Sequence, residues 1–184
     1  MIQLIIKDAF FVLAEFFPFA MVCGGILLTI AGLTQCIHRK QVMSKVFMSS
    51  PRGYLLLYLF FVYLTMVLAI TVLSREQGSR IGITLEIFGT FSSSIYTNIY
   101  PVENVLMLIP FGFLLPLIWC KFRRLLWCMS SGVLLSLLIE LMQYITQRGF
   151  VQTDDVIMNT LGTMIGYSVY YGYQALLHYI RSID

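Results

Sequence analysis

Long apolar runs, separated by short polar connectors, dominate the chain from one end to the other. Five runs approach the ~20 residues that a helix needs to cross about 30 Å of hydrocarbon. They cover residues 10–37, 54–73, 102–119, 125–145 and 156–180. The pattern therefore predicts an all-α fold, a polytopic transmembrane helix bundle of about five spans.

The connector between the second and third runs, from Ser74 to Tyr100, is the longest. Within it, the segment RIGITLEIFGTF places Ile81, Leu85 and Phe88 at helical spacing. This spacing predicts a short interfacial helix between spans two and three. Such a helix either covers the bundle or contacts a substrate.

Composition agrees with a membrane protein. The chain is 59% hydrophobic and 11% charged, whereas soluble domains carry about 25% charged residues. Its 184 residues leave room for a single membrane domain, 1–184, with an extra N-terminal span at 10–37. The net charge of +3 is scattered, so membrane lipids are expected partners and nucleic acid is not. No cofactor motif occurs, and we expect no cofactor.

The basic residues predict an orientation. Most Lys and Arg side chains fall in the connectors after the first and third runs, around residues 39–52 and 121–124. The positive-inside rule then predicts a multi-pass protein of the cell membrane with its N-terminus outside and its C-terminus in the cytoplasm.

Polar residues interrupt the apolar runs at one depth, near the predicted outer face. Glu140 and Gln143 are three residues apart and Asp155 and Asn159 four apart, so each pair shares a helical face. An arginine fork in the intervening connector would help a buried carboxylate to stay ionised. Such groups are costly in a membrane and favour a function. The predicted polar, substrate-binding pocket consists of Asn104, Glu140, Gln143, Arg148, Asp155 and Asn159.

Plainer or different roles exist for the acidic residues. Asp154 and Asp155 suit the N-terminal cap of a helix. Glu140 has a structural alternative, an ion pair with Arg148 alone. A divalent cation held by Glu140, Asp154 and Asp155 is a third reading, although we predict no metal site.

Other residues in the same runs have structural roles by type. Gly162 and Gly166 form a small-xxx-small pair that lets another helix approach closely. Pro110 and Pro116 in the third run predict a bend that frees backbone carbonyls. The structural set is Pro110, Gly112, Gly162 and Gly166.

Taken together, these motifs resemble the VanZ-like family of bacterial membrane proteins. The run NVLMLIPFGFLLPL begins at Asn104, SLLIELMQ ends at Gln143, Arg148 follows, and DDVIMNTLGTMIGY begins at Asp154. The signature region is 104–166, within a resemblance over roughly 54–172. The resemblance implies an accessory role in glycopeptide (teicoplanin) resistance or in the cell envelope, and it transfers no catalytic residue. The matching positions are Asn104, Pro110, Gly112, Glu140, Gln143, Arg148, Asp155, Asn159 and Gly162.

Three functions fit these features. The first is binding of a lipid-linked or lipophilic amphiphile, such as a glycopeptide or a lipid-linked peptidoglycan precursor, at the outer leaflet. The second is an intramembrane enzyme acting on a lipid-linked envelope precursor, with Glu140 or Asp155 as general base. Its nucleophile is the weak point, because His38 and His178 fall on the predicted cytoplasmic side and this topology excludes a Ser-His pair. The third is a small lipid or drug transporter. We favour the first, a protein that is not an enzyme.

Overall fold

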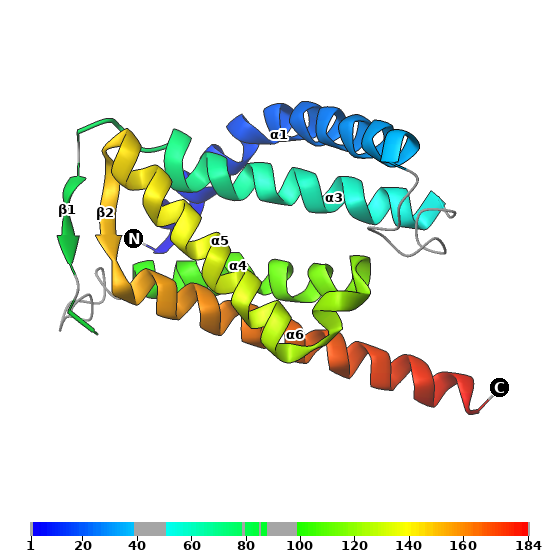
Figure 1. Cartoon of the computed structure of the whole chain (residues 1–184). Helices are drawn as coiled ribbons and strands as arrows, with labels where there is room; N and C mark the ends of the chain where they lie inside the picture. Colours follow the sequence, from blue (N-terminus) through cyan, green and yellow to red (C-terminus); the bar gives the residue numbers. More distant parts are fainter. Residues whose placement is uncertain (1, 39–50, 79, 85, 88–98, 184) are drawn as a thin grey trace.

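The structure is a computed structural model and describes residues 2–38, 51–78, 80–84, 86–87 and 99–183. Helices make up almost all of it, and two short strands lie at one end of the bundle (Figure 1). The elements are α1 (Ile2–His38), α3 (Pro51–Leu68), the π-helical turn η1 (Ala69–Leu73), β1 (Arg80–Thr84), α4 (Ile99–Ile118), the 3-10 turn η2 (Cys120–Arg123), α5 (Leu125–Thr146), β2 (Arg148–Gln152) and α6 (Thr153–Arg181).

The expected all-α membrane bundle is confirmed. In the described part of the chain, four helical segments are long and apolar enough to cross a membrane: Val12–Leu33, Pro51–Leu73, Pro101–Ile118 and Leu125–Thr146. The fifth predicted run lies in α6, which is 29 residues long. Its Asn, Thr, Gly and Tyr residues make α6 less apolar than the other four. Helix α6 packs against both α4 and α5 along one face of residues 153–170, whereas most side chains of residues 171–181 are exposed.

Helices α4 and α6 make the most extensive contact between any two elements (Figure 1). Gly162 and Gly166 of α6 lie against the carbonyl oxygens of Val105 and Ile109, where any added Cβ would collide with the α4 backbone. Gly112 of α4 lies in the same way against the α6 backbone. The two backbones are therefore in direct contact, as the small-xxx-small spacing predicts.

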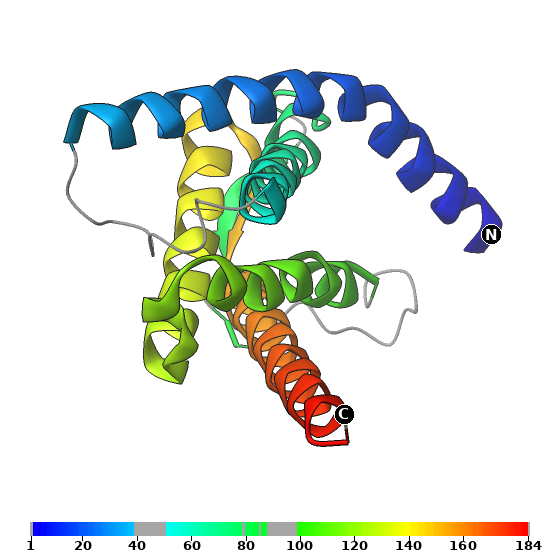
Figure 2. The same ribbon diagram turned by 90° about the vertical axis from the view of Figure 1, so that its right-hand side faces the viewer.

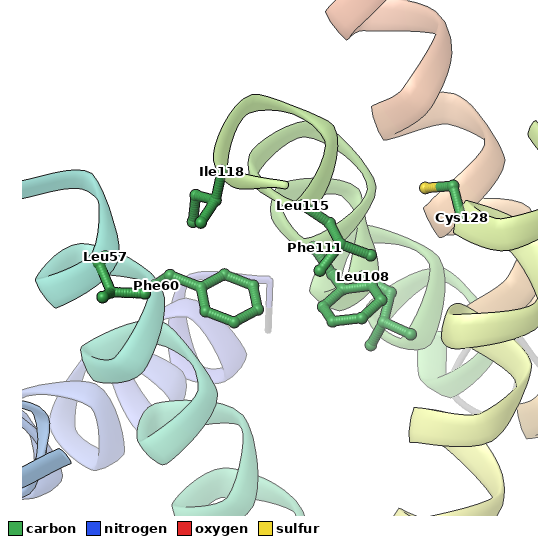
Figure 3. Close-up of a cluster of buried hydrophobic side chains, with 7 residues drawn as sticks. All are labelled: Leu57, Phe60, Leu108, Phe111, Leu115, Ile118 and Cys128. Carbon is green, nitrogen blue, oxygen red and sulfur yellow. The ribbon is translucent and has the colours of Figure 1, made fainter. Parts of the chain in front are cut away.

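A hydrophobic cluster joins α3, α4 and α5 (Figure 3). Phe60 of α3 stacks on Phe111 of α4 with ring centroids 6.0 Å apart. Tyr63 of α3 donates a hydrogen bond to the Met107 carbonyl at 2.7 Å. These contacts fix α3 beside α4. The buried members of the cluster are Leu57, Phe60, Leu108, Phe111, Leu115, Ile118 and Cys128.

The prolines of α4 do not interrupt the helix, which continues through Pro110 and Pro116. Pro116 has no N–H for the Gly112 carbonyl four residues earlier. The buried Cys128 thiol of α5 approaches that oxygen at 3.9 Å as a weak donor. At this position, the freed carbonyl is used for helix packing.

The predicted interfacial helix is wrong where the structure describes it. Arg80–Thr84 is a β-strand that pairs in parallel with β2, with Arg80 opposite Arg148 and Thr84 opposite Gln152. Ile81 and Ile83 alternate around Gly82, a period that suits a strand once a partner is present. Gly82 also makes room for Phe150, whose ring lies 2.6 Å from the position of an added Cβ. Leu85 and Phe88 lie outside the described residues.

Helix α1 packs on the outside of the bundle against α3 and η1 (Figure 2). It is a single helix containing Pro18, and it bends in its N-terminal half (Figure 2). Proline removes a helical hydrogen bond, which accounts for a bend. Gly24 gives the closest approach to α3, where an added Cβ would lie 2.6 Å from the Val62 side chain.

Candidate functional site

Two carboxyl groups meet between α5 and α6, at the end of the bundle that carries the strands. The side chains of Glu140 of α5 and Asp155 of α6 lie within hydrogen-bonding reach of each other. Asn104 of α4 is also hydrogen-bonded to Asp155. The Gln152 backbone N–H donates to Glu140 Oε2 at 2.9 Å. Asp155 thus links predicted site residues of three helices, Asn104 of α4, Glu140 of α5 and itself in α6.

A second polar pair lies deeper along the same helix faces. The Asn159 side-chain amide donates to Ser136 Oγ at 2.8 Å. Ser136 precedes Glu140 by four residues and Asn159 follows Asp155 by four, so the two pairs form successive rungs between α5 and α6. We call these four residues the polar ladder. Its inner side chains are buried, with Glu140 4% and Asn159 1% exposed.

Two buried amide oxygens, one in the polar ladder and one close to it, have no hydrogen-bond partner in the part of the chain that the structure describes. They are Oε1 of Gln143 and Oδ1 of Asn159. Gln143 is 2% exposed, and its Nε2 donates to the Thr71 carbonyl at 3.0 Å. An unsatisfied buried oxygen costs about 1–3 kcal/mol. Such a cost is more typical of a functional region than of simple helix packing.

The cation beside the carboxyl groups is Arg75, which follows η1 in the chain. Its positive charge interacts electrostatically with the carboxyl groups of Glu140 and Asp155. It also acts on Glu103, which is exposed near the start of α4. Arg75 is not among the residues of the polar pocket predicted from the sequence. Its position two residues after an apolar run, at the depth of the acidic residues, was the available signal.

Gly149 makes the approach of Arg75 possible. A Cβ added to Gly149 would lie 2.9 Å from Nη1 of Arg75 and 3.1 Å from Oε1 of Gln143. A larger residue at this position of β2 would push both side chains away. The pairing of β1 with β2, where the sequence predicts a helix, therefore also shapes the site.

Arg148 does not form the predicted ion pair with Glu140 or Asp155. Its Nη1 donates to the carbonyl oxygens of Val72 and Leu73, at 3.3 and 3.2 Å. These carbonyls end η1, where the helix leaves them without backbone partners and where a cation is favoured. The segments after η1 and after α5 each bring one arginine to this end of the bundle, and Arg75 takes the place expected for Arg148.

The outer edge of the cluster reaches the surface of the bundle. Asn104, Asp155 and Arg75 are half-buried, and Glu103 is exposed. Asp154 is buried in the first turn of α6, but the residue at the N-cap position is Gln152. Among the described residues, no group of three or more His, Cys, Asp and Glu side chains is arranged to hold a metal ion.

An apolar groove of about 420 Å³ lies beside this region, between α1, the α3–η1 segment and α5. Its walls come from three helices that are separate in sequence. Residues that line it include Cys23, Leu27, Leu68, Val72, Leu73 and Met142. We call it the apolar groove.

The VanZ/LLP1 family model matches residues 53–177. The chain belongs to the VanZ/LLP1 family. Searches of curated proteins and of solved structures found no match. The resemblance noted in the sequence is therefore confirmed, and the VanZ/LLP1 match covers the polar ladder, Arg75 and Arg148. Helix α1, which supplies one wall of the apolar groove, lies outside the VanZ/LLP1 match.

Proposed function

We propose that this protein binds a lipid-linked or lipophilic amphiphile at the polar end of its helix bundle. The role would be accessory, in glycopeptide (teicoplanin) resistance or elsewhere in the cell envelope. On the orientation predicted from the basic residues, the site faces the outer leaflet of the cell membrane. Lipoglycopeptides with an acyl tail and lipid-linked peptidoglycan precursors are present there.

The observation that carries this proposal is the half-exposed polar edge at the end of an apolar bundle. A tie between helices needs only one satisfied pair. Here Arg75 stands beside the carboxyl groups of Glu103, Glu140 and Asp155. Placing several ionisable groups at this depth is costly. Binding of a polar head group by this edge would explain why the ionisable groups are kept there despite that cost.

The chemistry of the edge suits a sugar–peptide head group. The carboxyl and amide oxygens of Asp155 and Asn104 accept hydrogen bonds from hydroxyl, amide or ammonium groups. Their backbone supports are rigid, because α4 and α6 touch through glycine. A preorganised set of acceptors loses little freedom when the ligand arrives.

Binding of fluorescent teicoplanin to the purified protein in lipid nanodiscs tests the proposal. We expect saturable binding, and at least tenfold weaker binding by an Asp155→Ala variant, because one hydrogen-bonded charged contact is worth about 1.5–3 kcal/mol. An Arg181→Ala variant, changed at the far end of α6, is the matched control. Deacylated teicoplanin should bind more weakly than the acylated form. Equal affinity of the Asp155→Ala variant and the unchanged protein contradicts the proposal.

The close pairing of the Glu140 and Asp155 carboxyl groups favours one second candidate, an intramembrane enzyme. Two carboxyl groups that share a proton are an arrangement that supports general acid–base catalysis. Lipid-linked envelope precursors would be the substrates. Incubation of the protein with membrane lipid extract, with and without Mg²⁺, tests this candidate by mass spectrometry of the lipids. A new lipid product that a Glu140→Gln variant does not form supports it, and an unchanged lipid profile under both conditions contradicts it.

A further inference from the structure

The apolar groove offers almost nothing polar to a ligand. Among its lining residues, Thr65 is the one with a polar side chain, and its hydroxyl donates to the Phe61 carbonyl at 2.9 Å. The volume of about 420 Å³ falls within the range of ~300–1,000 Å³ typical of small-molecule sites. The groove therefore suits a hydrocarbon chain.

The groove also lies at membrane depth. The residues that line it come from Val12–Leu33, Pro51–Leu73 and Leu125–Thr146, three of the segments able to cross a membrane. A groove on the side of such segments faces the acyl chains of the bilayer. One end of the groove is formed by Val72 and Leu73, the last residues of the segment Pro51–Leu73.

A cation stands directly beyond that end. Arg148 is anchored to the carbonyl oxygens of Val72 and Leu73 through Nη1 alone. In the described residues, its Nε and Nη2 make no hydrogen bond, and no carboxylate forms an ion pair with it. A guanidinium held this way presents its Nε–Nη2 edge, with two parallel N–H donors, to an anionic group, the geometry that phosphate prefers.

The head group must select the lipid, because the groove itself cannot. An acyl chain is already surrounded by apolar neighbours in the bilayer, so entering the groove brings no hydrophobic gain. A charge-assisted hydrogen bond at the membrane surface does discriminate between lipids. Occupancy should thus depend on lipid charge and on Arg148.

We propose that the apolar groove seats one acyl chain of an anionic amphiphile whose phosphate or carboxylate binds Arg148. This inference rests on the proposed function and names the part of the site that holds the chain. It also gives α1 a role, since α1 supplies one wall of the groove although it lies outside the family match.

Photolabelling in nanodiscs tests the inference. Two probes carry a diazirine in one acyl chain, phosphatidylglycerol with a negative head group and phosphatidylcholine with no net charge. We expect the phosphatidylglycerol probe to label Cys23, Leu27 and Met142 several-fold more than the phosphatidylcholine probe does. Equal labelling by the two probes, spread over all lipid-facing residues, would mean ordinary bilayer lipid and overturn the inference.

Two leucines of α3 provide a matched pair of variants. Leu68 lines the groove and is 43% exposed, whereas Leu59 is 46% exposed and lies outside it. Leu68→Trp should fill the groove and reduce its labelling several-fold, and Leu59→Trp should leave labelling unchanged. Unchanged labelling in Leu68→Trp contradicts the inference, as does cross-linking of the groove to a second protein chain.

Variants of Arg148 test the head group. Arg148→Gln should reduce phosphatidylglycerol labelling to the phosphatidylcholine level, and Arg148→Lys, which keeps the charge, should retain most of the preference. An unchanged preference in Arg148→Gln overturns the inference. The outcome is separable from that of the proposed function. Teicoplanin binding without groove labelling would refute only the proposal that the groove seats an acyl chain. Groove labelling without teicoplanin binding would refute only teicoplanin as the ligand of the proposed function.

Discussion

Helix α6 meets α4 through backbone, whereas α1 meets α3 mainly through side chains. At the first contact, Gly162 and Gly166 face carbonyl oxygens that cannot move without moving a whole helix. At the second, Gly24 approaches Val62, while Gly25 and Gly32 have open space beside them. The first contact fixes the polar ladder. The second leaves α1 room to adjust, as a wall of a lipid groove requires.

The largest expected effect comes from enlarging a glycine at the α4–α6 contact. Gly166→Ala would drive a methyl group into the Ile109 carbonyl, and overpacking of this kind costs about 1–3 kcal/mol or more. Gly172→Ala in the same helix has nothing within 4 Å. We expect a clearly lower melting temperature in detergent for Gly166→Ala and an unchanged melting temperature for Gly172→Ala. Equal melting temperatures would break the distinction between the two contacts.

Next in size is the loss of Glu140, which ties α5 to β2 and α6. Glu140→Ala removes the acceptor of the Gln152 N–H and one of the partners of the Asp155 carboxyl, at a cost of about 2 kcal/mol. Glu140→Gln keeps an acceptor for the N–H and a donor for the carboxyl. We expect Gln to restore most of the lost unfolding free energy, measured by denaturant titration. If Ala is as stable as Gln, the contact is not structural.

A smaller effect separates the two arginines. Because Arg75 acts on Asp155 and Arg148 binds backbone carbonyls, a double-mutant cycle should give a coupling of about 1 kcal/mol for Arg75 with Asp155. For Arg148 with Asp155, it should be near zero. Added salt should weaken the first coupling. The reverse ranking would restore the pairing that the sequence suggested.

The smallest effect is expected at the α1–α3 contact. Gly24→Ala gains about 1 kcal/mol of helix propensity and loses a similar amount against Val62, a clash that α1 can relieve by shifting. We expect a melting temperature close to that of the unchanged protein, and a small increase when Val62→Ala is added. A loss as large as that of Gly166→Ala would show that α1 is held as firmly as α6.

The sequence predicts well what depends on spacing within one helix. Apolar runs locate the spans. Glu140 and Asp155 are predicted to lie at one depth because both are close to the connector that joins their two spans. The spacing of Gly162 and Gly166 within one helix predicts a close helix contact. The partner of that contact, α4, follows from the structure alone.

The sequence predicts poorly what depends on a distant partner. Residues 80–84 form a strand because Arg148–Gln152 lies beside them, and nothing within the segment itself reveals that. The choice between Arg75 and Arg148 has the same origin. Both arginines reach one end of the bundle, and the carbonyls that end η1 and the small Gly149 decide which one turns toward the carboxyl groups.

Spin-label distances test the central claim, a fixed α4–α6 core beside an adjustable α1. Labels at Val22 and Leu138 span α1 and α5, and labels at Leu106 and Val169 span α4 and α6; all four side chains are exposed, and the four native cysteines would be replaced. We predict one narrow distance distribution for the α4–α6 pair, unchanged by lipid. For the α1–α5 pair, we predict a broad distribution that narrows with phosphatidylglycerol. An α1–α5 distribution as narrow as the other, and unchanged by lipid, would contradict the account.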